Sequence, residues 1–309
     1  MSYFSQNYFY QVPANKKLRV IVHTDCKNEA DDQFALAHHL MTEKYDVVGI
    51  IAGHFNDNPQ EYGVGNTAKA SYDEILKMLD LMGLSGKYPV AMGSAYPMKD
   101  CTDLIESEGA DMIIAEALKD DPRPLYICCQ GAITDIGCAI LKEPAICEKM
   151  TVIWIGGGMY PDGCKEFNLR NDIAAANILF SSKTEVWQVP INVYKQAAVS
   201  LAELQVRVRP CGEVGRYLFE QMVDYNNKTL KPHWPHGETW GLGDQATVTL
   251  LLDEKERFNY DLIPAPYILP DMSYDFTPEN RPIRVYHTID ARLTMEDFYA
   301  KLAINFGSK

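Results

Sequence analysis

The sequence lacks the cysteine patterns that mark a disulfide framework. Its eight cysteines are scattered over 309 residues and form no CxxC pair. This spacing argues against a small disulfide-rich scaffold and favours a reducing compartment. Cys128 and Cys129 lie in an apolar run, where buried thiols behave as small hydrophobic side chains. We therefore expect these two cysteines to have a structural role.

Long apolar runs and a secretory signal are also missing. No apolar stretch approaches the roughly 20 residues that a helix needs to cross a bilayer. Residues 1–7 contain neither a basic segment nor the apolar core that is typical of a signal peptide. We therefore expect a cytoplasmic protein without a membrane partner.

Positive charge is scarce along the chain. The sequence has 29 Lys and Arg residues against 42 Asp and Glu residues, which gives a formal net charge of −13. No dense cluster of Lys and Arg offsets this balance, and such a surface repels polyanions. We therefore expect a small-molecule ligand, and neither nucleic acid nor an anionic membrane as a partner.

The chain also has no linker composition and no internal repeat. No Gly/Ser/Pro-rich tract, charge block or low-complexity segment divides it. Its length suits one large α/β domain or two smaller ones, and 47% of its residues are hydrophobic, which is ample for a core. We favour a single domain over residues 1–309, in which residues 200–309 are less regular and complete the site.

Strand-like and helical patterns alternate along the first two thirds of the sequence. We expect strands at 18–22, 47–52, 88–92, 124–129, 151–155 and 186–193, and a closing strand and helix within 283–302. We expect helices at 66–81, 111–118, 134–141, 174–180, 217–225 and 245–252. This order predicts an α/β fold with an open, mainly parallel but mixed sheet, flanked by helices in a Rossmann-type core.

Three aspartates gather behind the first apolar run. Asp25 follows the expected strand at 18–22, and Asp31 and Asp32 precede a helical pattern. Ligands of open α/β sheets bind at the carboxyl ends of strands, and several neighbouring carboxylates are best tolerated around a cation. Helix capping by Asp31 is the alternative, but it explains only one carboxylate, because Asp25 lies on the strand side.

The acidic loop resembles the start of the nucleoside hydrolase superfamily, of the inosine/uridine-preferring type. The likeness continues in PVAMGS at 89–94, CQGAITDI at 129–136 and IWIGGG at 153–158. It is strong again in Glu166-Phe167-Asn168, which is followed by Asn171-Asp172, and in Gly243-Asp244 before a helix. The matching segments follow the order of the family and cover most of the chain to about residue 252.

This resemblance implies a calcium-dependent enzyme. The implied Ca²⁺ ligands are Asp25, Asp32, Asp244 and the backbone carbonyl of Gln130, and a set of oxygen ligands alone also suits Ca²⁺ on chemical grounds. The resemblance further implies that Asp25 deprotonates a water, which attacks the sugar and cleaves the N-glycosidic bond of a ribonucleoside or related N-riboside to give ribose and base. Because relatives of this kind are commonly dimers or tetramers, the resemblance also implies a homodimer or homotetramer.

The same resemblance implies a ribose site. Asp31, Glu166 and Asn168 are expected to bind the ribose hydroxyls, and His54 stands where the family has a ribose-binding Asn after the second strand. The sequence does not decide which aromatic side chain stacks on the base, because several are candidates. These candidates are His54, Trp234, His236 and Trp240.

Several positions depart from the family motif and indicate a divergent branch. Five residues, including Asn28 and Glu29, separate Asp25 from the Asp pair, where the family has three. His23 replaces an Asp, and Gly243 replaces a leaving-group His. These departures keep open a second hypothesis, a non-catalytic or differently specific metal-containing protein that binds a sugar or nucleoside. A phosphatase with an aspartate nucleophile is disfavoured, because that chemistry needs Asp-x-Asp at the strand end.

Overall fold

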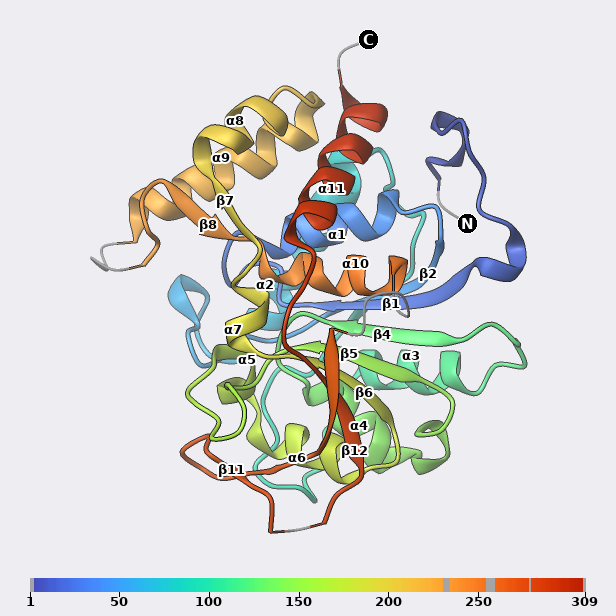
Figure 1. Ribbon diagram of the computed structural model, residues 1–309, viewed down its shortest axis with the longest axis vertical. Helices are drawn as coiled ribbons and strands as arrows, with labels where there is room; N and C mark the ends of the chain where they lie inside the picture. Colours follow the sequence, from blue (N-terminus) through green and yellow to red (C-terminus); the bar gives the residue numbers. More distant parts are fainter. Residues whose placement is uncertain (1–2, 230–233, 254–258, 278, 308–309) are drawn as a thin grey trace.

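A computed structural model of the chain describes residues 3–229, 234–253, 259–277 and 279–307. Strands and helices alternate through its first two thirds, as the sequence predicts (Figure 1). The strands are β1 (Leu18–Thr24), β2 (Tyr45–Ala52), β3 (Val90–Met92), β4 (Leu125–Cys129), β5 (Thr151–Ile155), β6 (Glu185–Val189), β7 (Ala198–Ser200), β8 (Thr239–Gly241), β9 (Tyr260–Pro264), β10 (Tyr267–Ile268), β11 (Tyr274–Asp275) and β12 (Pro282–Tyr286).

The main sheet has eight strands in the order β3-β2-β1-β4-β5-β6-β12-β9. Neighbouring strands pair in parallel except at the edge, where β9 runs antiparallel to β12. The predicted open, mainly parallel but mixed sheet is therefore confirmed. The order reverses between β1 and β4, which creates a crevice at their carboxyl ends. Every residue of β1 is buried, as expected for a parallel strand that is covered on both faces.

Helices cover both faces of this sheet. They are α1 (Asp32–Met41), α2 (Thr67–Leu81), α3 (Glu108–Ala117), α4 (Thr134–Lys142), α5 (Phe167–Asn171), α6 (Ile173–Ser181), α7 (Ile191–Tyr194), α8 (Leu201–Arg207), α9 (Gly212–Lys228), α10 (Ala246–Leu252) and α11 (Ala291–Phe306). Figure 1 shows α1, α10 and α11 on one side of the sheet and α3, α4 and α6 on the other. The buried hydrophobic residues form two clusters accordingly.

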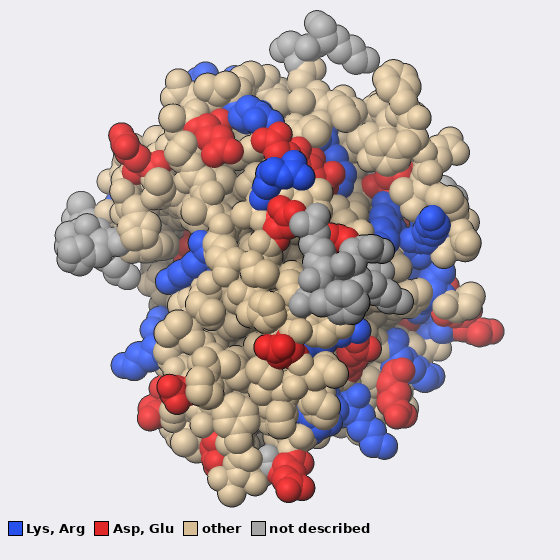
Figure 2. Space-filling view, in the orientation of Figure 1, with Lys and Arg blue, Asp and Glu red and all other residues tan. Residues whose placement is uncertain are grey.

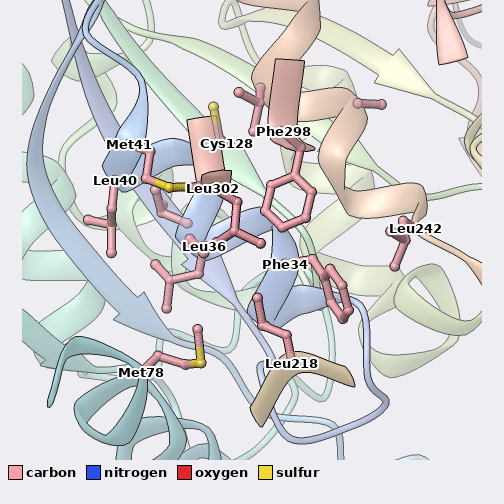
Figure 3. Packing of buried hydrophobic residues seen from close by; sticks show 14 of the residues in the cluster. Phe34, Leu36, Leu40, Met41, Met78, Cys128, Leu218, Leu242, Phe298 and Leu302 are labelled. Carbon is pink, nitrogen blue, oxygen red and sulfur yellow. The ribbon is translucent and has the colours of Figure 1, made fainter. Parts of the chain in front are cut away.

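Helix α1 lies in the middle of the larger cluster, with all of its residues buried. Its Phe34 and Leu36 lie among Met78 of α2, Leu218 of α9 and Phe298 of α11 (Figure 3). Each large aliphatic or aromatic side chain buried in this way stabilises the fold by about 1.5–3 kcal/mol. This packing fixes the beginning of α1, which carries Asp32 into the crevice between β1 and β4.

The expected strand at 186–193 is wrong in its second half. Strand β6 ends at Val189, and Ile191–Tyr194 form the short helix α7 instead. Pro190 lies between them and has no N–H group to donate to a strand ladder. The turn after β6 therefore places Tyr194 at the carboxyl edge of the sheet. Helix α9 is longer than the expected 217–225, because it begins at Gly212 and ends at Lys228.

The eight cysteines are all free thiols. In the part of the chain that the structure describes, no helix is both long and apolar enough to cross a membrane. Figure 2 shows Lys and Arg side chains interspersed with Asp and Glu on the face in view.

Candidate active site

A cavity of about 350 Å³ lies at the carboxyl edge of the sheet. Its volume is in the range of small-molecule sites. Seven of the residues that the sequence analysis selects line this cavity: Asp25, Asp31, Asp32, Gln130, Glu166, Asn168 and Asp244. Asp25 follows β1 and Gln130 follows β4, so the cavity opens where the strand order reverses. The structure thus brings these residues together in the crevice that the fold class predicts.

The loop between Asp25 and Asp31 is held by three glutamine side chains from separate elements. Gln33 Nε2 of α1 donates to the carbonyl oxygen of Cys26 at 2.7 Å. Gln60 Nε2 donates to the carbonyl oxygen of Asn28 at 2.5 Å, and Gln221 Nε2 of α9 donates to that of Ala30 at 2.8 Å. Alternate carbonyls of the lengthened loop are thus satisfied.

Carboxylates converge at the floor of the cavity. One ligand oxygen from each of Asp31, Asp32 and Asp244 lies within 4.8 Å of the other two. Asp31 makes no side-chain capping hydrogen bond to α1, so the capping alternative does not account for its position. Asp25 is 1% exposed, and its Oδ2 atom is buried without a hydrogen-bond partner among the described residues. The cluster therefore holds more negative charge than its own hydrogen bonds satisfy.

The electrostatics of these carboxylates follow from burial and mutual repulsion. Burial, followed by the charges of Glu29 and Asp32, raises the pKa of Asp31 well above its ordinary value. Burial and the charge of Asp32 do the same to the pKa of Asp25, and burial and the charge of Asp31 do so for Asp244. Burial raises the pKa of Asp32 to about 6. Carboxylates that repel one another in this way are stabilised by a cation between them.

The residues present fit a hard divalent cation. Carboxylate oxygens and a backbone carbonyl are the ligands that Ca²⁺ and Mg²⁺ prefer in proteins. Gln130 contributes a carbonyl oxygen that already accepts a hydrogen bond from Asn168 Nδ2 at 2.9 Å and retains a second lone pair. The unpartnered Oδ2 atom of Asp25 is the strongest sign, because a buried carboxylate oxygen without a donor is costly.

Glu166 and Asn168 are positioned by the first turn of α5. Glu166 caps this helix: its Oε1 accepts from Asn168 N at 3.1 Å and its Oε2 accepts from Leu169 N at 2.8 Å. Asn168 Nδ2 also donates to the carbonyl of Ile155 at 2.8 Å, which ties α5 to the end of β5. Both side chains are thus held rigidly at the cavity wall.

Tyr194 of α7 occupies the space beside Gly243. A Cβ atom at Gly243 would lie 2.8 Å from Tyr194 Cδ2, so this glycine admits the ring. The Tyr194 hydroxyl donates to Glu166 Oε1 at 3.0 Å. Burial and the charge of Glu166 raise the pKa of Tyr194 well above its ordinary value, so the hydroxyl stays protonated. A tyrosine ring therefore fills the space next to the position where the family has a histidine.

His54 does not line the cavity, in contrast to its expected role in ribose binding. It is 1% exposed, and its Nε2 lies 2.8 Å from Thr134 Oγ1, which donates in turn to Asp172 Oδ2 at 2.7 Å. His23, another departure from the family motif, is also buried, with Nε2 2.9 Å from Asp135 Oδ2. These two histidines belong to hydrogen-bond networks beneath the site, so we do not retain His54 as a ribose ligand.

The other aromatic candidates lie on one wall of the cavity. Trp234, His236 and Trp240 all line it. Trp234 and Trp240 have ring centroids 5.7 Å apart, and each also packs edge-on against Tyr225 of α9. This group adds an aromatic surface to the lining of the cavity.

The sequence analysis did not select several residues that line the cavity. Tyr194, Lys165, Lys195 and Arg170 are among them, and Glu29 was noted only as an addition to the loop. Tyr194 and Lys195 could be found only by placing the end of β6 correctly at Pro190. Lys165 and Arg170 flank the Glu166-Phe167-Asn168 segment, and their closeness to it in sequence was the only indication that they line the cavity.

Comparison with known proteins gives a consistent result. Residues 20–297 match the family model of the inosine-uridine preferring nucleoside hydrolases. The chain is 27% identical to the inosine-uridine preferring nucleoside hydrolase of Leishmania major over 164 residues, which are 52% of this chain and 51% of that protein. It is 25% identical to the protein of the same name from Crithidia fasciculata over 290 residues, which are 82% of this chain and 91% of that protein.

Solved structures show the same fold. The purine-preferring ribonucleoside hydrolase from Gardnerella vaginalis superposes with a TM-score of 0.74 at 19% identity, and the match covers 93% of this chain and 99% of that one. This likeness concerns the arrangement of the sheet and helices.

Proposed function

This chain belongs to the inosine-uridine preferring nucleoside hydrolase family, and from that premise we propose that it hydrolyses the N-glycosidic bond of a ribonucleoside to ribose and base. The observation that carries the proposal is the buried, unpartnered Oδ2 atom of Asp25 at the floor of the cavity. A carboxylate oxygen in that position is suited to accept a proton from a water that attacks the sugar.

We propose that the cation is Ca²⁺, held by Asp25, Asp32, Asp244 and the carbonyl oxygen of Gln130, with Asp31 adjacent. When bound, the cation supplies positive charge that neutralises the cluster and lowers the pKa of a nearby water. Asp25 Oδ2 then takes up the proton from that water. The carboxylates around it favour the positive charge that develops on the sugar as the bond to the base breaks.

The remaining lining residues orient the substrate. Asp31 and Asn168 face the cavity and are proposed to bind ribose hydroxyls, while Glu166 holds the turn that carries Asn168. The base is proposed to pack against Trp234 and Trp240, whose rings form the aromatic wall.

The experiment that tests this function measures the release of free ribose from a panel of purine and pyrimidine nucleosides in the presence of Ca²⁺. We expect turnover by the wild-type protein and a loss of about 100-fold or more in Asp25→Asn, because the proton acceptor is removed. Asp73→Asn is the matched control, since it removes the same charge from an exposed position in α2. Equal activity of Asp25→Asn and wild type would contradict the role of Asp25.

A second candidate function is favoured by one observation. Gly243, with the Tyr194 ring beside it, stands where the family resemblance places a leaving-group His. A protein that binds an N-riboside without cleaving it is compatible with this change. Tight calorimetric binding of a nucleoside together with no ribose release from any member of the panel would establish this second function.

Assembly and location belong to the same proposal. We propose a cytoplasmic homodimer or homotetramer, on the family resemblance. Sedimentation equilibrium of the purified protein measures the state directly, and a monomer at micromolar concentration would contradict it.

A further inference from the structure

Two lysines lie at the cavity wall on either side of a single hydrogen bond. Lys165 immediately precedes Glu166, and Lys195 immediately follows Tyr194. Because the Tyr194 hydroxyl donates to Glu166 Oε1 at 3.0 Å, the backbones that carry the two lysines are brought together. Both lysines line the cavity, and both are exposed. Both lysines therefore line the cavity next to the Tyr194–Glu166 contact in sequence.

The charges of these two lysines are available to a ligand. Over the described residues, neither the Lys165 nor the Lys195 ammonium group forms a hydrogen bond or an ion pair. Arg170, the other Lys or Arg residue in the cavity wall, differs, because its Nε donates to Asp57 Oδ2 at 2.5 Å and its guanidinium lies over the Phe167 ring. Two unpaired positive charges in the wall of a cavity are notable in a protein whose net charge is −13.

The carboxylate between the lysines has no free acceptor position. Glu166 Oε2 accepts from Gly157 N at 2.9 Å and from Leu169 N, while Oε1 accepts from Asn168 N and from the Tyr194 hydroxyl. These four donors fill the roughly four lone-pair sites of a carboxylate. A sugar hydroxyl has to displace one of them before Glu166 accepts from it. This end of the cavity therefore offers ammonium donors to the substrate more readily than a carboxylate acceptor.

We propose that the substrate carries a phosphate on its sugar, as a nucleoside 5′-monophosphate does, and that Lys165 and Lys195 bind this phosphate. The inference rests on the proposed N-riboside hydrolysis and names the substrate class of the same site. A phosphomonoester carries a charge of about −1.5 to −2 at pH 7, and lysine binds phosphate as a point charge. The anion is placed on the sugar because the lysines flank Glu166, next to the proposed ribose contact Asn168.

The test compares kcat/KM for inosine and uridine with kcat/KM for their 5′-monophosphates. The variants are Lys165→Gln, Lys195→Gln and the double variant, and Lys183→Gln is the control because that lysine is exposed outside the cavity. We expect the wild-type protein to prefer the monophosphates by roughly ten- to a hundredfold, as two charge-assisted contacts provide. The double variant is expected to lose most of that preference, and Lys183→Gln is expected to keep it.

Two results would overturn this assignment. One is a wild-type protein that uses nucleosides and monophosphates equally well; the other is a preference that the double variant retains. A nucleoside with a carboxylate on its base provides a further arm: a lysine-dependent preference for this compound over the 5′-monophosphate places the anion on the leaving group and refutes the sugar placement.

Binding separates this inference from the proposed hydrolysis. Calorimetry with Asp25→Asn, which keeps the two lysines, measures the affinity for a 5′-monophosphate and for the parent nucleoside. Lysine-dependent preference in binding without turnover of either compound by wild type contradicts the hydrolase function and supports the anion site. Turnover of nucleosides without any preference for the 5′-monophosphates supports the hydrolase function and contradicts the anion site.

Discussion

Asp32 carries a charge that the fold does not neutralise by itself. The residue is 2% exposed, and its Oδ1 accepts a hydrogen bond from Thr24 Oγ1 at 2.5 Å. Burial raises its pKa from the ordinary 3.8 to about 6, and Asp25 and Asp244 add to the negative charge around it. Replacing Asp32 with Asn preserves the shape and an acceptor for Thr24 but removes the charge. We expect Asp32→Asn to stabilise the cation-free protein at neutral pH.

The magnitude and the sign follow from this pKa. A rise of the pKa to about 6 corresponds to about 3 kcal/mol of unfavourable free energy when Asp32 is ionised in the folded state. Below pH 3.8 the residue is protonated in the folded and unfolded states alike, so the variant has no advantage. Between pH 3.8 and 6 only the folded state holds the proton, so stability of the wild type falls as pH rises. The advantage of Asp32→Asn is therefore complete above about pH 6.

Urea unfolding with EGTA from pH 4 to pH 8 measures this difference between the two proteins. Added Ca²⁺ is expected to reverse the order, because binding to the folded wild type stabilises it by about 4.1 kcal/mol at a thousandfold excess over Kd, which exceeds the advantage of the variant. Asp73→Asn is the control, since its side chain is 58% exposed and the expected change is below about 1 kcal/mol. A variant that is less stable than wild type in EGTA at pH 7.5 would refute the electrostatic argument.

Three further substitutions test the geometry of the site. Tyr194→Phe removes one donor from Glu166 and is expected to lower kcat/KM by about tenfold, which steady-state kinetics measures. Gly243→Ala places a Cβ atom 2.8 Å from the Tyr194 ring, so we expect a loss of about 1–3 kcal/mol in urea unfolding together with reduced activity. His54→Gln breaks the contact with Thr134 and is expected to cost about 1–3 kcal/mol with no change in KM, because His54 lies outside the cavity. A raised KM in this variant would return His54 to the site.

The sheet was predictable because its strands are continuous apolar runs. Residues 18–22, 47–52, 124–129 and 151–155 all fall within or close to observed strands, since buried parallel strands carry apolar side chains on both faces. Apolar character did not mark where β6 ends. The run at 186–193 stays apolar through α7, and only the missing N–H group of Pro190 separates strand from helix.

The carboxylates were predictable for a different reason. Asp25, Glu166 and Asp244 follow strand ends or precede helices, so the chain order alone places them at one edge of the sheet. Lys165 and Lys195 were not predictable in this way, because each is an exposed lysine whose sequence neighbours give no sign that both line one cavity. The segments that carry them are joined by the hydrogen bond between Tyr194 and Glu166, a contact between residues that are 28 positions apart.

The lengthened loop connects these observations, because repelling carboxylates need a rigid backbone. Glu29 adds to the charge that raises the pKa of Asp31, so the two additional residues increase the repulsion within the cluster. The loop withstands this repulsion because Gln33, Gln60 and Gln221 each bind one of its carbonyls from a separate element. A flexible loop would relieve the repulsion by moving the carboxylates apart, whereas a fixed loop stores it until a cation binds. The glutamines therefore hold the loop that carries the carboxylates of the proposed cation site.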